Sequence, residues 1–181
     1  MKKIIIATIV LLNILPKMHV AAQEKVYSDK KQTVISYSMN HPLHAWTADN
    51  NEITSIILTD ENRSTIQQVA VSAKVASFDS KNANRDSHMI EILEGIKYPT
   101  ITFESHSIKQ DGDLLTVQGT MVFHGVKQEI TFEAVKNTSN KNKLEITGSF
   151  IVKMTQFNIE PPSLMGMDTD DEIKISFKMI Y

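Results

Sequence analysis

The fold of this chain is decided by the stretch Val117-Gln118-Gly119-Thr120-Met121-Val122-Phe123-His124-Gly125-Val126-Lys127-Gln128-Glu129-Ile130-Thr131-Phe132. Apolar side chains or glycine stand at every second residue from Val117 to Phe123, and a second alternating run ends at Phe132. A period of two is typical of a β-strand with one buried face. The pair His124-Gly125 separates the two runs, so the stretch predicts a β-hairpin.

Alternation of the same kind extends along the chain on both sides of this hairpin. Polar, turn-prone segments such as 110–113 and 137–142 separate the alternating runs. No linker rich in Gly, Ser or Pro divides the chain, and there is no internal repeat, so we expect one domain. Eight strands are predicted, over 33–39, 53–58, 66–75, 100–108, 114–123, 126–135, 143–153 and 172–180.

One segment has helical spacing instead. Asp86 is expected to cap its first turn, and Gly95 stands where such a helix ends, before Pro99 starts the next strand. The chain is therefore predicted to be all-β with one short α-helix between the third and fourth strands. The apolar residues at helical spacing are Met89, Ile90, Leu93 and Ile96.

Eight antiparallel strands with short connections predict a lipocalin-like up-and-down barrel, because closing the sheet removes its edges. A two-sheet sandwich is the alternative. Gly119 and Gly148 lie within strands, where a glycine marks a bend or a close approach to the backbone. We expect a bend that also leaves the lumen locally empty. The candidate ligand-binding lumen residues are Val117, Gly119, Met121, Phe123, Phe132, Ile146, Gly148, Phe150, Ile175 and Phe177.

Three short motifs stand in one order along the middle of the chain: Arg85-Asp86-Ser87-His88, Tyr98-Pro99-Thr100-Ile101-Thr102-Phe103, and the Gly119-to-Val126 turn with His124-Gly125. Together they resemble the YceI-like family of secreted lipid- and polyisoprenoid-binding proteins. The resemblance extends by pattern over residues 33–181. It implies a carrier that holds an apolar lipid, such as a polyisoprenoid, a quinone tail or an amphiphile, inside the barrel, with no other cofactor.

Four residues are placed at the barrel mouth or in structural roles: Arg85, Asp86, His88 and Tyr98. Asp86 is expected to serve as the helix cap, and Arg85 to bond loop carbonyls. The alternative is that Arg85 holds the polar head of a ligand. The chain departs from the family at 40–47, where Pro42 is expected to end or kink the first strand.

Neither a catalytic residue nor a metal ligand is assigned. The sequence has no cysteine, no nucleophile elbow and no phosphate-binding loop. His41 and His44 are three residues apart, so on one extended strand they point to opposite faces. Two rival functions stay open: a lipid-modifying enzyme with His88 or His124 as general base, and a non-binding structural or stress-response barrel filled by its own side chains.

The N-terminal segment of the chain predicts export. Met1-Lys2-Lys3 precedes a short apolar run, and small residues stand before Gln23, so residues 1–22 are expected to be a cleaved signal peptide and 23–181 the domain. Without residues 1–22 the formal charge is about −5, which argues against nucleic acid as a partner. No later segment is long enough to span a bilayer. We expect a periplasmic or extracellular protein, with a homodimer left open.

Overall fold

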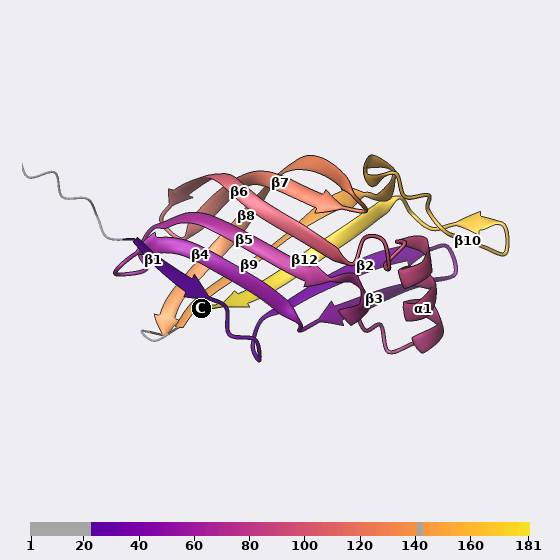
Figure 1. Cartoon of the computed structure of the whole chain (residues 1–181), viewed down its shortest axis with the longest axis horizontal. Helices are drawn as coiled ribbons and strands as arrows, with labels where there is room; N and C mark the ends of the chain where they lie inside the picture. The colour runs from indigo at the N-terminus through magenta and orange to yellow at the C-terminus, as the bar shows by residue number, and fades with distance from the viewer. Residues whose placement is uncertain (1–22, 141–142) are drawn as a thin grey trace, which may run out of the picture.

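A ten-stranded antiparallel sheet forms the body of the protein, whose computed structural model describes residues 23–140 and 143–181. Figure 1 shows the sheet strongly curled around its long axis. The strands in this sheet are β1 (Gln23–Tyr27), β2 (Val34–His41), β3 (His44–Asn50), β4 (Ile53–Asp60), β5 (Ile66–Lys74), β6 (Thr100–Asp111), β7 (Leu114–Phe123), β8 (Val126–Asn140), β9 (Lys143–Lys153) and β12 (Glu172–Ile180).

The smaller elements lie between these strands. A 3-10 turn, η1 (Val75–Ser77), and the helix α1 (Ala83–Ile92) connect β5 to β6. A second 3-10 turn, η2 (Met154–Phe157), and a two-stranded hairpin of β10 (Ser163–Leu164) and β11 (Met167–Asp168) connect β9 to β12. In Figure 1, α1 and the β10–β11 hairpin lie at one end of the molecule, and the C-terminus lies toward the other end.

The predicted strands are all present, but the predicted eight-stranded closed barrel is wrong. The order in the sheet is β1-β4-β5-β6-β7-β8-β9-β12-β2-β3, with β1 and β3 at its two edges. A closed barrel requires β2 to pair with β4, and the extra strands β3 and β1 occupy those two edges instead. The alternation of apolar residues did not predict either strand, because β1 buries only Val26 and β3 carries mostly polar residues. Pro42 does end β2, as predicted, in the turn to β3.

The hairpin quoted from the sequence is confirmed residue by residue. Phe123 pairs with Val126, so the loop between β7 and β8 contains only His124 and Gly125. Both have positive φ, 50° and 74°, which is the signature of the tight turn that best matches strand twist. The inward face of β7 is fully buried at alternate residues, as the sequence pattern requires.

The expected helix is present, but its cap is not Asp86. The helix begins at Ala83, and the side chain of Asn82 accepts the hydrogen bond from the Arg85 backbone N–H at 3.2 Å. The Asp86 carboxylate instead accepts the Ser80 backbone N–H, at 3.1 and 3.3 Å, and so ties the preceding loop to the helix. Several Asn and Asp residues adjoin this start, and the spacing of the apolar residues does not choose between them. Gly95 follows shortly after the helix end, as expected.

We expect Asn82→Ala to lower the free energy of unfolding by about 1 kcal/mol, because the substitution removes the accepting side chain of the cap. Chemical denaturation measures this change. Asn84→Ala is the matched control, since Asn84 is exposed inside the same helix and is not its cap. Equal losses in the two variants would mean that the cap contributes nothing specific.

The end of the sheet away from α1 is closed by the last residue of the chain. Tyr181 is 7% exposed, and its hydroxyl shares a hydrogen bond with the buried Ser55 hydroxyl of β4. The backbone of Tyr181 also exchanges two hydrogen bonds with Leu144 of β9. Burial raises the pKa of Tyr181 to about 12, because the phenolate loses its hydration there.

High pH is therefore expected to destabilise the protein through this residue. The pKa of Tyr181 is higher in the folded state than in the unfolded chain. Its contribution to the free energy of unfolding is therefore complete below pH 10.0 and is lost as the pH rises through about 12. The loss amounts to about 2–3 kcal/mol. Denaturation at successive pH values should show a shallower decline for Tyr181→Phe than for the wild type. Tyr27→Phe, at a 64% exposed site, should decline like the wild type.

Candidate functional site

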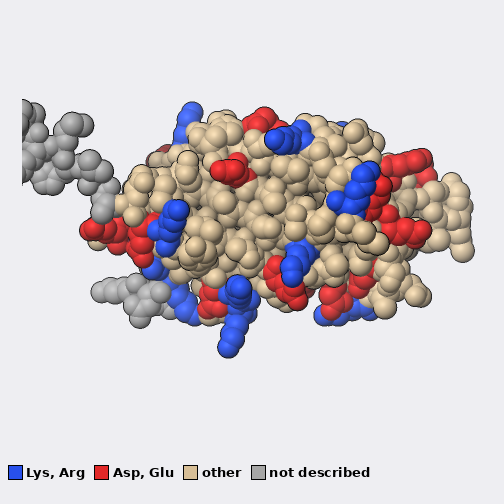
Figure 2. Space-filling view, viewed as in Figure 1, with Lys and Arg blue, Asp and Glu red and all other residues tan. Residues whose placement is uncertain are grey.

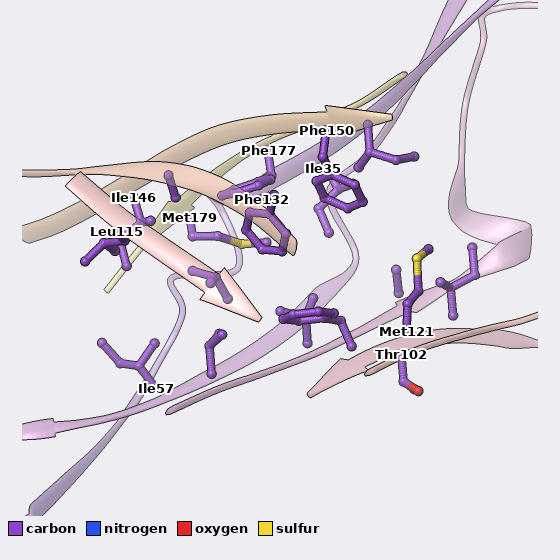
Figure 3. Close-up of a pocket in the computed structure, with 18 of the residues that line it drawn as sticks. Ile35, Ile57, Thr102, Leu115, Met121, Phe132, Ile146, Phe150, Phe177 and Met179 are labelled. Atoms are coloured by element: carbon purple, nitrogen blue, oxygen red, sulfur yellow. The ribbon is translucent and has the colours of Figure 1, made fainter. Parts of the chain in front are cut away.

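The concave side of the curled sheet encloses an apolar cavity of about 120 Å³, which we call the Phe132 cavity. Side chains from β2, β4–β9 and β12 line it, and Figure 3 shows the labelled ones reaching into a common space. Thr102 and Tyr181 are the lining residues whose side chains carry a polar atom. An apolar cavity of this size stays dry and in another protein binds benzene.

A second apolar cavity, of about 110 Å³, continues the first toward α1, and we call it the Trp46 cavity. The lining of this second space comes from β2, β3, α1 and the ends of β7 and β12. The two cavities adjoin, because four residues line both: Phe78, Ile101, Met121 and Ile175. Met121 is a flexible side chain at this junction, so the two spaces can merge without a change in the backbone.

Aromatic rings fill part of the Phe132 cavity. Phe132 stacks on Phe150 with ring centroids 4.8 Å apart and meets Phe177 edge-on at 5.6 Å. Phe103 packs against Phe132 in a tilted arrangement, with ring centroids 5.4 Å apart. All four rings are only partly buried. The interior is therefore neither an empty lumen nor a closed core.

The structure brings most of the predicted lumen residues together. Phe123 lines the Trp46 cavity. Gly119 and Gly148 line neither cavity. The predicted residues that line the Phe132 cavity are Val117, Met121, Phe132, Ile146, Phe150, Ile175 and Phe177.

The two glycines do not leave the interior empty, so that part of the expectation is wrong. A Cβ atom on Gly119 would lie 2.5 Å from the Phe103 ring, and one on Gly148 would lie 2.6 Å from the Phe177 ring. Each missing side chain is replaced by an aromatic ring from a neighbouring strand. The expected bend is real at Gly119, because β6 has a register shift between Ser105 and Ser107 opposite it.

A large part of the cavity wall was missed from the sequence. It comes from β4, β5 and β6, whose apolar alternation was recognised as strand but not assigned a face. A strand pattern identifies two faces and does not say which one is concave, so only packing separates them. The main missed residues are Ile57, Ile66, Val69, Val71, Ile101, Phe103 and Ile108.

Two of the four residues predicted at the mouth or in structural roles line the Trp46 cavity. Arg85 and His88 both line it. Among the described residues, the Arg85 guanidinium makes no hydrogen bond to a loop carbonyl. Its central carbon lies 5.2 Å from the centre of the Trp46 ring, a cation–π contact. Tyr98 lies outside both cavities and packs edge-on against the His124 ring at 4.7 Å.

The two histidines around Pro42 are neighbours after all. His41 and His44 face each other across the β2–β3 hairpin, and their rings are 5.5 Å apart. The expectation of opposite faces treated both as parts of one strand, whereas the chain turns between them. Across the described residues, no three His, Asp or Glu side chains come together in a way that could hold a metal ion.

The two candidate general bases, His88 and His124, border one open groove of about 810 Å³. His124 is held at both ring nitrogens, by the Phe157 carbonyl at 3.1 Å and the Glu94 carboxylate at 3.0 Å. His88 is exposed and lies 3.6 Å from Glu91. Of the two, His88 also lines the Trp46 cavity, and His124 does not.

Charge on the surface is mixed. Figure 2 shows acidic and basic side chains interspersed over one face, without a continuous basic stripe. None of the helices in the described ranges has the length and apolar character needed to cross a bilayer.

Comparison with known proteins agrees with this architecture. The family model described as the YceI-like domain matches residues 27–181. This chain belongs to the YceI-like family. Protein YceI of Escherichia coli O157:H7 is 30% identical over 118 residues, and its Salmonella newport counterpart is 29% identical. The matched region is 64% of this chain, and it spans 62% of the length of these curated relatives.

Solved structures share the fold of this YceI-like chain at low sequence identity. Burkholderia cenocepacia BcnA superposes with a TM-score of 0.75 at 17% identity, covering 85% of this chain and 99% of its own. A polyisoprenoid binding domain from Saccharophagus degradans superposes with a TM-score of 0.68 at 12% identity, covering 87% and 97%. These two proteins thus share the fold of this chain, and the second of them is a polyisoprenoid binding domain.

Proposed function

We propose that this YceI-like protein binds one long apolar lipid chain within the curled sheet and carries or sequesters it. The observation that carries this proposal is the pair of adjoining cavities with an almost wholly apolar lining. A polyisoprenoid, a quinone tail or a similar amphiphile fits such a lining. Each 100 Å² of hydrocarbon buried there contributes about 2.5 kcal/mol before ordering costs are subtracted.

A long chain needs more room than the two cavities offer in this state. Met121 and the partly buried phenylalanine rings lie where the chain would pass. These side chains can rotate without breaking hydrogen bonds, since none of them carries a polar group other than the methionine sulfur. Binding is therefore expected to open the junction between the cavities rather than to unfold any strand.

Native mass spectrometry of protein purified from its own cells tests the proposal. We expect a protein carrying one copurified lipid, which solvent extraction releases for identification. A protein that arrives empty and also fails to take up solanesol from detergent would contradict lipid binding. It would favour the alternative of an interior closed by its own side chains.

We also propose export to the periplasm or the extracellular medium. The support is the basic start and the short apolar run before Gln23, which lie outside the described residues. N-terminal sequencing of the exported protein should begin at Gln23. A chain that still begins at Met1 would mean that the segment is retained.

A further inference from the structure

The pairing between β8 and β9 covers only part of the two strands. Their ladder ends where Ala134 pairs with Gly148, and none of the described pairs joins 126–133 of β8 to 149–153 of β9. Both strands keep their other neighbours over these segments, because β8 stays paired with β7, and β9 with β12. The sheet therefore has an unpaired seam between 126–133 and 149–153, which we call the β8–β9 slot.

The slot is bounded at both of its ends. The β8–β9 ladder closes one end. At the other end, the side-chain amide of Gln128 donates a hydrogen bond to the Gln156 carbonyl of η2 at 2.8 Å. The His124 ring in the turn before β8 lies 3.1 Å from the Phe157 carbonyl of η2. The slot is thus an opening within the wall of the sheet, not a loose edge.

Two aromatic rings close this opening. Phe132 and Phe150 stand two residues beyond the last pair of the ladder, and their rings stack across the seam with centroids 4.8 Å apart. Both rings line the Phe132 cavity, and both also line an outer groove of about 410 Å³, bordered by Thr131 and Ser149. Figure 3 shows the two labelled phenylalanines on the same side of the cavity. These rings therefore separate the interior from the outer surface at the slot.

Other boundaries of the interior are held by hydrogen bonds. Asp49 of β3 and Asp79, in the connection after β5, exchange two backbone hydrogen bonds, at 3.1 and 2.9 Å. Tyr181 and Leu144 exchange two more at the end away from α1. At the α1 end, the Asp86 carboxylate ties the helix to the preceding loop. A lipid chain that enters at these places must break hydrogen bonds, each of which stabilises the closed structure.

We propose that the β8–β9 slot is a lateral entry site, through which the isoprenoid chain of a lipid passes from the outer groove into the Phe132 cavity. This inference rests on the proposed lipid-binding function. Rotation of the Phe132 and Phe150 rings joins the groove to the cavity and breaks no pair of the ladder. The rings then line the path, so the hydrocarbon stays in apolar contact as it leaves water.

An entry site controls rates and does not control affinity. Blocking the slot therefore slows the uptake and the release of the lipid by the same factor, and the equilibrium occupancy stays unchanged. Substitutions inside the cavities act differently, because they change the contacts of the bound chain and with them its affinity. Rates and occupancy measured together thus distinguish the entry site from the cavities.

Cysteine cross-linking tests the route in a chain that has no native cysteine. Thr131→Cys and Ser149→Cys place one thiol on each strand that borders the outer groove, and a short bifunctional thiol reagent joins them. Native mass spectrometry at successive times follows solanesol uptake from detergent micelles and its release into phosphatidylcholine vesicles. We expect the cross-link to slow both rates at least about tenfold, relative to the same protein before cross-linking.

Two controls and a second block accompany this experiment. Lys109→Cys with Thr116→Cys is the matched pair, because these residues are already paired across β6 and β7, so the same reagent should change neither rate. A single Ser149→Cys variant that carries a bulky maleimide blocks the groove without a cross-link. Its control is Thr54→Cys with the same maleimide, at an exposed site where β4 is paired with β5. Thermal unfolding checks that each variant is folded.

Three results would overturn the proposal. Unchanged rates in both blocked proteins would place the entry elsewhere and leave lipid binding intact. A loss of equilibrium occupancy in both blocked proteins would make the slot part of the resting binding site instead of an entry. Failure of the unmodified protein to take up solanesol at all would refute the lipid-binding function itself.

Discussion

Gly119→Ala is expected to be among the most destabilising single substitutions in this protein, with a loss of about 3 kcal/mol or more. The new Cβ atom would lie 2.4 Å from the Glu104 carbonyl oxygen and 2.8 Å from the Ser105 Cα. Both atoms belong to the bulged backbone of β6, which cannot rotate away as a side chain does. Gly119→Leu should fail to fold. Chemical denaturation of the soluble fraction measures both variants.

Gly148→Ala is the matched comparison, because it places the same methyl group on the same kind of strand. Two of its three close contacts are with the ring of Phe177, at 2.6 and 3.0 Å. That ring is partly exposed to the Phe132 cavity and can swing into it, so the loss should be smaller. Equal stability of Gly119→Ala and the wild type would show that the β6 bulge yields to the methyl group.

Ile175→Phe is expected to abolish most lipid binding while the protein stays folded. Ile175 lines both cavities at their junction, so a larger ring there enters existing space and divides the two. Excluding about 100 Å² of hydrocarbon costs about 2.5 kcal/mol, or roughly 70-fold in affinity. Titration with solanesol in detergent, followed by native mass spectrometry, measures the change.

Ile151→Phe provides the control for added hydrophobic bulk. Ile151 lies on the neighbouring strand β9, opposite Lys174, and is 57% exposed. We expect wild-type binding and stability for this variant. Unchanged lipid binding in a stable Ile175→Phe protein would mean that the chain does not pass the junction, and the proposed route would be wrong.

Much of the candidate site could be predicted from local patterns. The inward residues of β7, β8, β9 and β12 alternate with polar ones, and most of them line the Phe132 cavity. The wall from β4 to β6 was missed, because alternation does not tell which face of a curled sheet is concave. The cation–π contact between Arg85 and Trp46 was missed for a different reason, since the two residues meet only when the β2–β3 hairpin packs beside α1.

Local signals in the sequence were sufficient to locate most of the individual strands and the β7–β8 turn. Period-two alternation located eight strands, and the pair His124-Gly125 set a two-residue turn, because side-chain direction and turn geometry depend on neighbouring residues. Tertiary structure alone decided whether the sheet closes and what occupies its concave side. The pairing of β1 with β4, and the ring of Phe177 over Gly148, join strands that are not consecutive in the chain. Such contacts depend on the curvature of the whole sheet, which no local pattern encodes.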